Sequence, residues 1–364
     1  MNVGETMRER VAAEIIAMGM VTPVGLSAAG SAAAVRAGIQ RITLSPVLNS
    51  HFQPVRAGFL CEDRLPPLSS ALSGWSARAP SRQQRLLRLA TGAIQEALSG
   101  RREPVPLLLA LPTVQAESEG PPRASFLERL ALQSGVSLDL RASRVLEHGR
   151  AGGLMAVEHA LRMLASKRAH QVLIGGVDSF LDLSLLATLD SEGRLPSEGG
   201  PSDGLIPGEG AVFLLLASPE GGQRRIASPR VRITTVGLGR EEGHRYSDKP
   251  YRGEGLSAAF QALFAARAGA QPVQCVYAGF NGENFWAKEW GVAHLRHSRR
   301  FADSLRIEHP AECTGDLGAA LGPMMLGLAA IGMQQGYRRG PCLIWCSSDL
   351  DERAAVLIEE GPAR

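Results

Sequence analysis

Residues 146–161, LEHGRAGGLMAVEHAL, join a turn of small residues to a helix with an apolar face. Turns of this kind often carry a catalytic nucleophile, because the amino end of a helix stabilises a thiolate. The position where such a nucleophile would stand holds Arg150. A guanidinium stays protonated in proteins and has no nucleophilic form. The chain therefore either uses unfamiliar chemistry or has kept a catalytic turn without its chemistry.

A substitute nucleophile could come from Cys313, which stands beside Thr314 and Gly315, with His148 as its base. Such a pair would require a rebuilt site, since a nucleophile and its base must lie within hydrogen-bond reach. A core thiol and a loop imidazole are the simpler interpretation.

Paired carboxylates are a second option for chemistry. Glu147 with Glu283, or Asp316 with Glu312, could be proposed as acid and base. Their spacing does not distinguish them from solvated loop acids. Glu209, in the segment PGEGA, is interpreted as a structural acid.

Strands and helices alternate along the chain, as hydrophobic runs and helical spacing indicate. Strands are predicted at 13–18, 104–111, 171–174, 211–218, 230–239, 273–280, 342–346 and 354–360. Helices are predicted at 27–37, 81–98, 154–165, 256–267, 286–298 and 319–333, and an irregular excursion at 43–80. The pattern predicts an α/β fold.

The length of 364 residues suits two domains or one large duplicated one. The strand–helix order restarts after a linker-like segment, PEGGQRRIASP. We therefore expect an N-terminal half at 1–218, a linker at 219–229 and a C-terminal half at 230–364. The halves share no obvious sequence repeat.

The composition argues against several classes of protein. The net charge of +3, with scattered Arg-Arg pairs, does not indicate a nucleic-acid partner. The five cysteines lack zinc-site spacing and are expected to be buried free thiols. We expect no metal and no cofactor, because neither a phosphate loop nor a dinucleotide fingerprint is present.

Two segments, the N-terminus and residues 317–333, decide whether the sequence indicates secretion or a membrane span. The first 20 residues carry Arg and Glu and lack the apolar core of a signal peptide. The uncharged segment 317–333 is shorter than the ~20 residues that a membrane span requires, and it is predicted to be a core helix. We expect a cytoplasmic protein without a membrane partner.

Four segments, taken in order, resemble the β-ketoacyl synthases, the ketosynthase branch of the thiolase superfamily. They are AMGMVTPVGLSAAGSAAAVRAGI (17–39), HQVLIGGVDSFLDLSLLATLDSEGRL (170–195), SDGLIPGEGAVFLLL (202–216) and CTGDLGAALGPMMLGLAAI (313–331). The resemblance implies a five-layer αβαβα core built from two similar halves. It also implies a dimer, and a decarboxylative condensation performed by a cysteine and two histidines on acyl groups from a carrier protein.

The catalytic residues of that family do not carry over to this chain. The nucleophile position falls on Arg150, the first histidine on the stretch that begins at Gly279, and the second histidine on Asp316. The upstream lysine is matched by Ala311 or Glu312, and the glycine-rich loop near the C-terminus by 347–351, SSDLD. The degenerate positions are thus Arg150, Gly279 and Asp316. The nearby candidate residues are His148, Asn281, Glu283, Glu312 and Cys313.

A buried, unpaired arginine would cost several kcal/mol, so an anion should accompany Arg150. The resemblance places Asp316 close to it, and we predict an Arg150–Asp316 ion pair. Glu283, Glu147 or a bound anion are alternatives, as is an Arg150 that points into solvent.

The resulting hypothesis is a catalytically degenerate ketosynthase-like protein that acts as a binding or partner subunit. Its partner would be a second copy of the chain, a ketosynthase-like protein or an acyl carrier protein. Two alternatives are an active acyltransferase of the 3-oxoacyl synthase type with a rearranged site, and an adaptor or chaperone scaffold for a secretion or biosynthetic machine.

Overall fold

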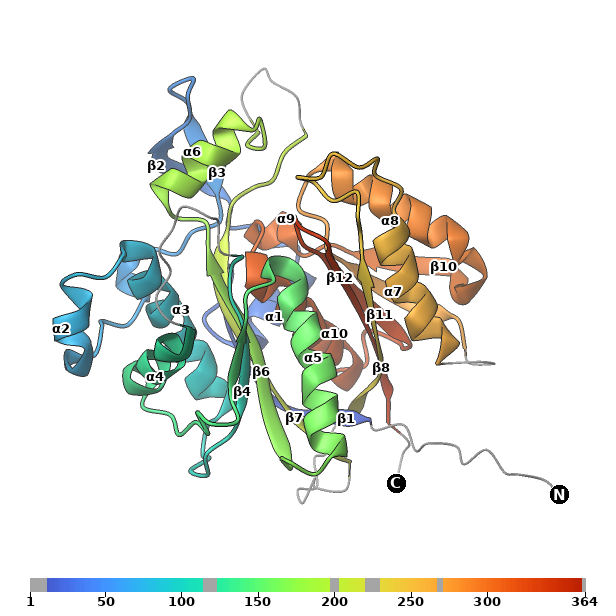
Figure 1. The fold of residues 1–364 in the computed structure, drawn as a ribbon, viewed down its shortest axis with the longest axis horizontal. Coiled ribbons are helices and arrows are strands. Elements are labelled where there is room, and N and C mark those ends of the chain that lie inside the picture. Colours follow the sequence, from blue (N-terminus) through green and yellow to red (C-terminus); the bar gives the residue numbers. More distant parts are fainter. Residues whose placement is uncertain (1–11, 114–122, 197–202, 220–229, 267–270, 362–364) are drawn as a thin grey trace.

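The computed structural model describes residues 12–113, 123–196, 203–219, 230–266 and 271–361 (Figure 1). Five strands belong to the first half: β1 (Ala13–Val21), β4 (Leu107–Ala110), β5 (Arg144–Leu146), β6 (Gln171–Ser179) and β7 (Glu209–Ala217). Five belong to the second half: β8 (Val231–Arg240), β9 (Val273–Ala278), β10 (Phe301–Glu308), β11 (Cys342–Ser347) and β12 (Glu352–Glu360). A separate hairpin is formed by β2 (Thr43–Leu48) and β3 (Pro54–Ala57).

The longer helices occur between these strands. They are α1 (Ala28–Arg36), α3 (Ser81–Ala97), α4 (Arg123–Ser134), α5 (Gly149–Ala165), α6 (Leu183–Ser191), α7 (Glu254–Ala265), α8 (Asn284–Arg296) and α10 (Leu321–Gln334). The short helices are η1 (Glu62–Arg64), η2 (Ser70–Leu72), α2 (Ser73–Ser76), η3 (Ser298–Arg300), α9 (Ala311–Thr314) and η4 (Gly318–Ala320).

Both halves have the same sheet topology. The order β5-β4-β6-β7-β1 in the first half is repeated as β10-β9-β11-β12-β8 in the second. In each half the first three of these strands are parallel, the fourth pairs antiparallel with the third, and the fifth pairs antiparallel with the fourth. The half-sheets meet at β1 and β8, where Ala13 pairs with Ile233 and Glu14 with Arg232. A duplicated fold explains this repetition without any sequence repeat.

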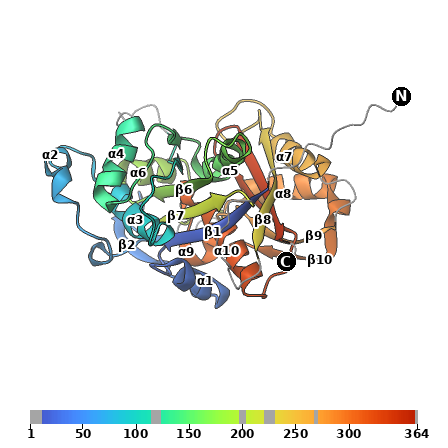
Figure 2. The same ribbon diagram turned by 90° about the horizontal axis from the view of Figure 1, so that it is seen from below.

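The helices and half-sheets form five layers. α3 and α4 cover the outer face of the first half-sheet, and α7 and α8 cover that of the second (Figures 1 and 2). α5 and α10 lie between the half-sheets and contact strands of both. The predicted α/β architecture of five layers and two similar halves is therefore confirmed. The linker at 219–229 lies, apart from Pro219, outside the described residues, so the domain boundaries stay a prediction.

Glycines allow the middle layer to pack closely. A Cβ on Gly153 of α5 would lie 2.3 Å from Pro323 Cδ of α10. A Cβ on Gly176 of β6 would lie 2.0 Å from the Ala319 carbonyl oxygen. These approaches bring the amino end of α5 against η4 and α10, which fixes the distance between Arg150 and the segment that carries Asp316.

The uncharged segment 317–333 forms η4 and most of α10, and the side chains of α10 are almost all buried in the core. Within the described ranges, no helix combines the length and the apolar character that a membrane crossing requires.

Some predictions of local structure were wrong. α5 begins at Gly149 rather than at 154, because small residues there pack closely and leave no apolar periodicity. β10 was missed, since its exposed edge carries polar residues. Residues 43–80 are not wholly irregular, because they contain the β2–β3 hairpin and short helices. All five cysteines are free thiols, but Cys61 is exposed in the loop before η1.

Candidate functional site

Arg150 stands in the first turn of α5, and its side chain is buried. Its Nε donates a hydrogen bond of 2.7 Å to Asp316 Oδ2, and its Nη1 donates one of 2.8 Å to Asp349 Oδ1. The predicted Arg150–Asp316 ion pair is confirmed, and the alternative of a solvent-facing Arg150 was wrong. Asp349 is a second partner that the sequence did not predict.

Burial alone would lower the pKa of the Arg150 guanidinium, but the carboxylates of Asp316, Asp349 and Glu283 raise it well above its usual value. Arg150 is thus a fixed positive charge at the amino end of α5. Its charge is compensated by carboxylates in the protein.

A second arginine extends this arrangement. Arg194 Nε and Nη2 donate to the two carboxylate oxygens of Glu283, at 2.8 and 3.0 Å. The same guanidinium bonds both oxygens of Asp349, at 3.1 and 3.2 Å, and the Tyr246 hydroxyl at 2.9 Å. Asp349 therefore joins Arg150 to Arg194.

Asn281 connects the carboxylates from the other side. Its Nδ2 lies 2.9 Å from Asp316 Oδ2 and 3.0 Å from Glu283 Oε2. Gly279 carries no side chain into the site, and a Cβ there would lie 2.8 Å from the Trp345 carbonyl oxygen. Of the stretch that begins at Gly279, Asn281 and Glu283 thus reach the site. No space exists for a histidine at Gly279.

These residues form a largely buried network of opposite charges, which we call the arginine–carboxylate network. Its cations are Arg150, Arg194 and Arg245, and its anions are Glu283, Asp316 and Asp349, with Glu192 at 3.6 Å from Arg194. Burial raises the pKa of the Glu283 and Asp349 carboxyl groups, but the arginines outweigh this and leave both pKa values below the usual range. Trp286 also contacts the network, because its Nε1 donates a hydrogen bond of 3.0 Å to Glu283 Oε2.

The loop at 347–351 fixes the turn before α5. The Ala151 amide donates to Ser348 Oγ at 3.0 Å, and Ser348 Oγ donates to the His148 carbonyl oxygen. Gly149 has a φ of 53°, a conformation that favours glycine. The segment 347–351 therefore supplies both Asp349 and the support for Arg150.

His148 does not face Cys313. Its Nδ1 lies 2.8 Å from Glu352 Oε1, and this hydrogen bond raises the pKa of the imidazole, although partial burial opposes the shift. The Cys313 thiol is buried, and burial raises its pKa to about 11. It is protonated at neutral pH, so the structure does not support a Cys313–His148 pair.

We expect the Glu352→Gln substitution to move the pKa of His148 back towards its usual value. A group whose pKa is raised in the folded state stabilises that state below the unfolded pKa, and its contribution is lost as the pH rises through the folded pKa. NMR titration of the carbon-bound protons of the imidazole measures the pKa of His148 in both proteins. Glu158→Gln, which alters the partner of the exposed His159, is the control and should leave the His148 titration unchanged. An identical His148 pKa in Glu352→Gln and the wild type would contradict the assignment.

Two further residues contribute no catalytic chemistry. Cys346 lies beside the network, 3.5 Å from where a Cβ on Gly279 would stand, but burial raises its pKa further and it has no access to solvent. Glu312 is exposed and lies 3.3 Å from His309. Neither Glu312 nor Cys313 belongs to the network.

Glu209 and two tryptophans of α8 have structural positions. Glu209 is fully buried and binds Arg85 at 2.6 Å and Ser179 Oγ at 2.7 Å. Trp286 and Trp290 point from α8 into the core that α7 and the second half-sheet also form. The structural interpretation of Glu209 is supported, and the tryptophans pack in the interior.

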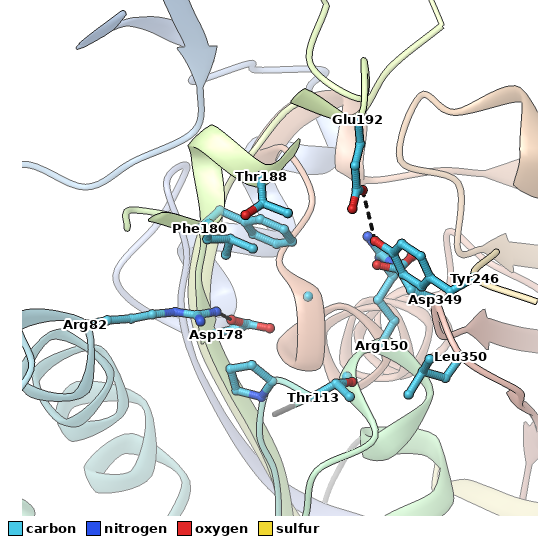
Figure 3. Close-up of a pocket in the computed structure, with 14 residues that line it drawn as sticks. Arg82, Thr113, Arg150, Asp178, Phe180, Thr188, Glu192, Tyr246, Asp349 and Leu350 are labelled. Atoms are coloured by element: carbon cyan, nitrogen blue, oxygen red, sulfur yellow. Dashed lines mark hydrogen bonds and ion pairs between the residues drawn. The ribbon is translucent and has the colours of Figure 1, made fainter. Parts of the chain in front are cut away.

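A pocket of about 540 Å³ opens beside Arg150 (Figure 3). Arg82 and Asp178 lie on one side of it, and Arg150, Tyr246 and Asp349 on the other. Its apolar lining consists of Pro112, Phe180, Leu185 and Leu350. The described residues contain no group of three or more His, Cys, Asp or Glu side chains suited to a metal ion.

Sequence reasoning missed Arg194, Arg245, Tyr246 and Asp349. Arg194 and Tyr246 come from irregular loops, and no local spacing marks them. Asp349 was noted only as part of a replaced loop. Their roles arise from the convergence of loops from both halves on the amino end of α5.

Comparison with known proteins identifies the fold. No family model and no curated protein sequence matches this chain. Among solved structures, the ketosynthase from module 6 of the bacillaene synthase of Bacillus subtilis 168 is similar over 97% of this chain and 72% of its own, with a TM-score of 0.77 and 13% identity. The ishigamide ketosynthase/chain length factor is similar over 97% of this chain and 100% of its own, with a TM-score of 0.75 and 15% identity.

A third similar structure is AntDE:AntF, a type II polyketide synthase acyl-carrier protein in complex with its ketosynthase bound to the hexaketide. It covers 97% of this chain and 100% of its own, with a TM-score of 0.74 and 14% identity. The chain therefore has a ketosynthase-like fold. At these identities the likeness extends to the fold alone.

Proposed function

We propose that this protein is a catalytically degenerate ketosynthase-like subunit that acts by binding a partner, either an active ketosynthase or an acyl carrier protein. The observation that carries the proposal is Arg150, paired with Asp316 and Asp349 where the family's nucleophile would stand. A condensing enzyme needs a thiolate there, and a guanidinium cannot replace one.

The arginine–carboxylate network also supports this proposal. Condensation requires donors that stabilise an enolate and an oxyanion. Here the two aligned histidine positions are Gly279 and Asp316, and a buried carboxylate such as Asp316 would repel a developing anion. The ion pairs inside the network already compensate most of its charges, so the network needs no substrate to compensate them.

The solved structures offer a precedent for partnership. One is described as a ketosynthase/chain length factor, and another as a ketosynthase in complex with an acyl-carrier protein. The pocket beside Arg150 has a partly apolar lining. This lining supports a subunit that still binds part of an acyl chain rather than a scaffold without a binding site.

Two experiments test the proposal. We expect a native pull-down of the tagged protein from its own host to recover a ketosynthase or an acyl carrier protein, identified by mass spectrometry. Recovery of unrelated machinery would instead support the adaptor alternative.

The second experiment addresses activity. We expect intact-protein mass spectrometry to find no covalent acyl adduct after incubation with acyl-coenzyme A or acyl-carrier thioesters, because no described thiol combines access with a lowered pKa at the site. An active ketosynthase treated in parallel is the positive control. A stoichiometric adduct, mapped to one residue, would establish the alternative of an acyltransferase with a rearranged site.

A further inference from the structure

Two of the free cysteines, Cys275 of β9 and Cys342 of β11, lie directly opposite each other in the second half-sheet. The two strands are parallel, and their register pairs the Cα atoms of these residues. Both side chains belong to the core between the half-sheets, whereas the next residues along, Val276 and Leu343, belong to the core on the outer face. The two thiols therefore leave neighbouring strands on the same face of the sheet.

The spacing of this pair suits a disulfide. Neighbouring strands lie about 4.8 Å apart, and a disulfide joins Cα atoms that are about 4.4–6.8 Å apart. A bond between Cys275 and Cys342 thus fits the existing distance between β9 and β11. Cys346, the other cysteine of β11, lies beside Gly279 instead.

The two thiols also interact electrostatically. A hydrogen bond from the Cys342 thiol lowers the pKa of Cys275, although burial opposes this shift. The same contact and burial raise the pKa of Cys342, whose Sγ also lies 3.5 Å from the Arg339 carbonyl oxygen. The nearby ion pair of Glu308 with Arg338 has opposing effects on the pKa of Cys275. Cys275 is therefore the better nucleophile of the two, because the thiolate is the reactive form.

The pair lies near one end of the sheet. Cys275 is 2% exposed and Cys342 is fully buried, but Pro272 and Arg339, three residues before them, are exposed. Local opening at the end of a sheet requires less free energy than unfolding of its centre. We therefore expect a small oxidant such as hydrogen peroxide to reach these sulfurs in the folded protein.

We propose that Cys275 and Cys342 are a redox pair that hydrogen peroxide converts reversibly into a disulfide between β9 and β11. The Cys275 thiolate attacks one peroxide oxygen, the O–O bond breaks, and the departing hydroxide takes up a proton to become water. The Cys342 sulfur then attacks the resulting sulfenic sulfur of Cys275, and a second water leaves with the Cys342 proton. The two thiols lose two electrons and two protons, and the peroxide is reduced to two waters. This inference is independent of the proposed function.

The disulfide would close a loop that contains α8, β10 and α10. The same loop carries Glu283 and Asp316 of the arginine–carboxylate network. A cross-link around so long a loop stabilises a protein mainly by restricting its unfolded chain. We therefore expect the oxidised protein to melt at a higher temperature than the reduced protein.

Peptide mapping of the peroxide-treated full chain tests the bond directly. The protein is reduced, freed of reductant, exposed to hydrogen peroxide, and then unfolded in N-ethylmaleimide, which labels the remaining thiols. We expect a linked peptide that joins Cys275 to Cys342 and that disappears after treatment with dithiothreitol. Cys61, the exposed thiol, reports that the oxidant was effective. The proposal is overturned if Cys275 and Cys342 are still labelled when Cys61 is fully oxidised, or if they are oxidised only to separate sulfinic acids.

Two alanine variants on β11 provide the matched comparison. Cys342→Ala should abolish the linked peptide, and its melting temperature should not rise after peroxide treatment. Cys346→Ala changes another fully buried thiol of the same strand, and it should keep both the linked peptide and the rise. Because Cys342 and Cys346 are close in sequence, this control also makes the mapping unambiguous. Identical melting curves for the reduced and peroxide-treated wild type, or a rise that persists in Cys342→Ala, would contradict the cross-link.

Discussion

The Arg150→Met variant is expected to lose about 3–5 kcal/mol of unfolding free energy, the usual cost of removing one partner from a buried ion pair. The reason is the carboxylate of Asp316, which is fully buried and, among the described residues, would keep only the Asn281 side chain and the Gly318 amide as donors. Asp349 retains Arg194 and is partly exposed, so it contributes less. Urea denaturation monitored by circular dichroism measures the difference.

The matched control for this experiment is Arg162→Met, on the same helix. Arg162 is 73% exposed and pairs with Glu158 one turn earlier. Pairs of this kind contribute about 0.3–0.5 kcal/mol, so the control should remain close to the wild type. If Arg150→Met costs no more than the control, Arg150 does not compensate buried charge, and the arginine–carboxylate network has been misassigned.

The Gly153→Ala variant is expected to lower the unfolding free energy by about 2–3 kcal/mol, within the range for overpacked cores. Alanine normally favours a helix over glycine by ~1 kcal/mol. Here the added methyl group would lie 2.3 Å from Pro323 Cδ and 3.3 Å from the Ala319 carbonyl oxygen. The proline ring is tied to its own backbone, so α5 and α10 would have to separate, which also lengthens the Arg150–Asp316 contact.

Gly291→Ala provides the control, because Gly291 also lies inside a helix but has nothing within 4 Å of the added methyl group. This variant should gain about 0.4–1 kcal/mol. Opposite signs for the two variants, measured by the same urea titration, are the expected result. A stabilised Gly153→Ala variant would mean that the middle layer is looser than described.

The arginine–carboxylate network shows how several charges can be buried together at the amino end of α5. Each buried charge is paired with an opposite charge, which offsets the cost of its burial. Arg194 and Asp349 come from loops in different halves of the chain. The network therefore joins the two halves at the amino end of α5.

The sequence alone predicted the α/β class, the two similar halves and most strands, because buried strands such as β7 are continuous apolar runs. The order of four short motifs predicted the ketosynthase-like fold, whereas the assignment of Arg150, Gly279 and Asp316 to the catalytic positions stays a prediction. The Arg150–Asp316 pair was predictable as well, since a buried arginine requires an anion and the resemblance placed Asp316 near it.

Only the tertiary structure determined the rest of the site. Asp349, Arg194, Arg245 and Tyr246 lie in loops whose local sequence carries no period and no spacing signal, and their contacts span up to 199 positions along the chain. The exposed edge strand β10 escaped prediction because half of its residues are polar. The side chains that a helix or strand buries recur with a period that its own sequence shows. Which distant loops meet depends instead on the packing of α5, η4 and α10 between the two half-sheets.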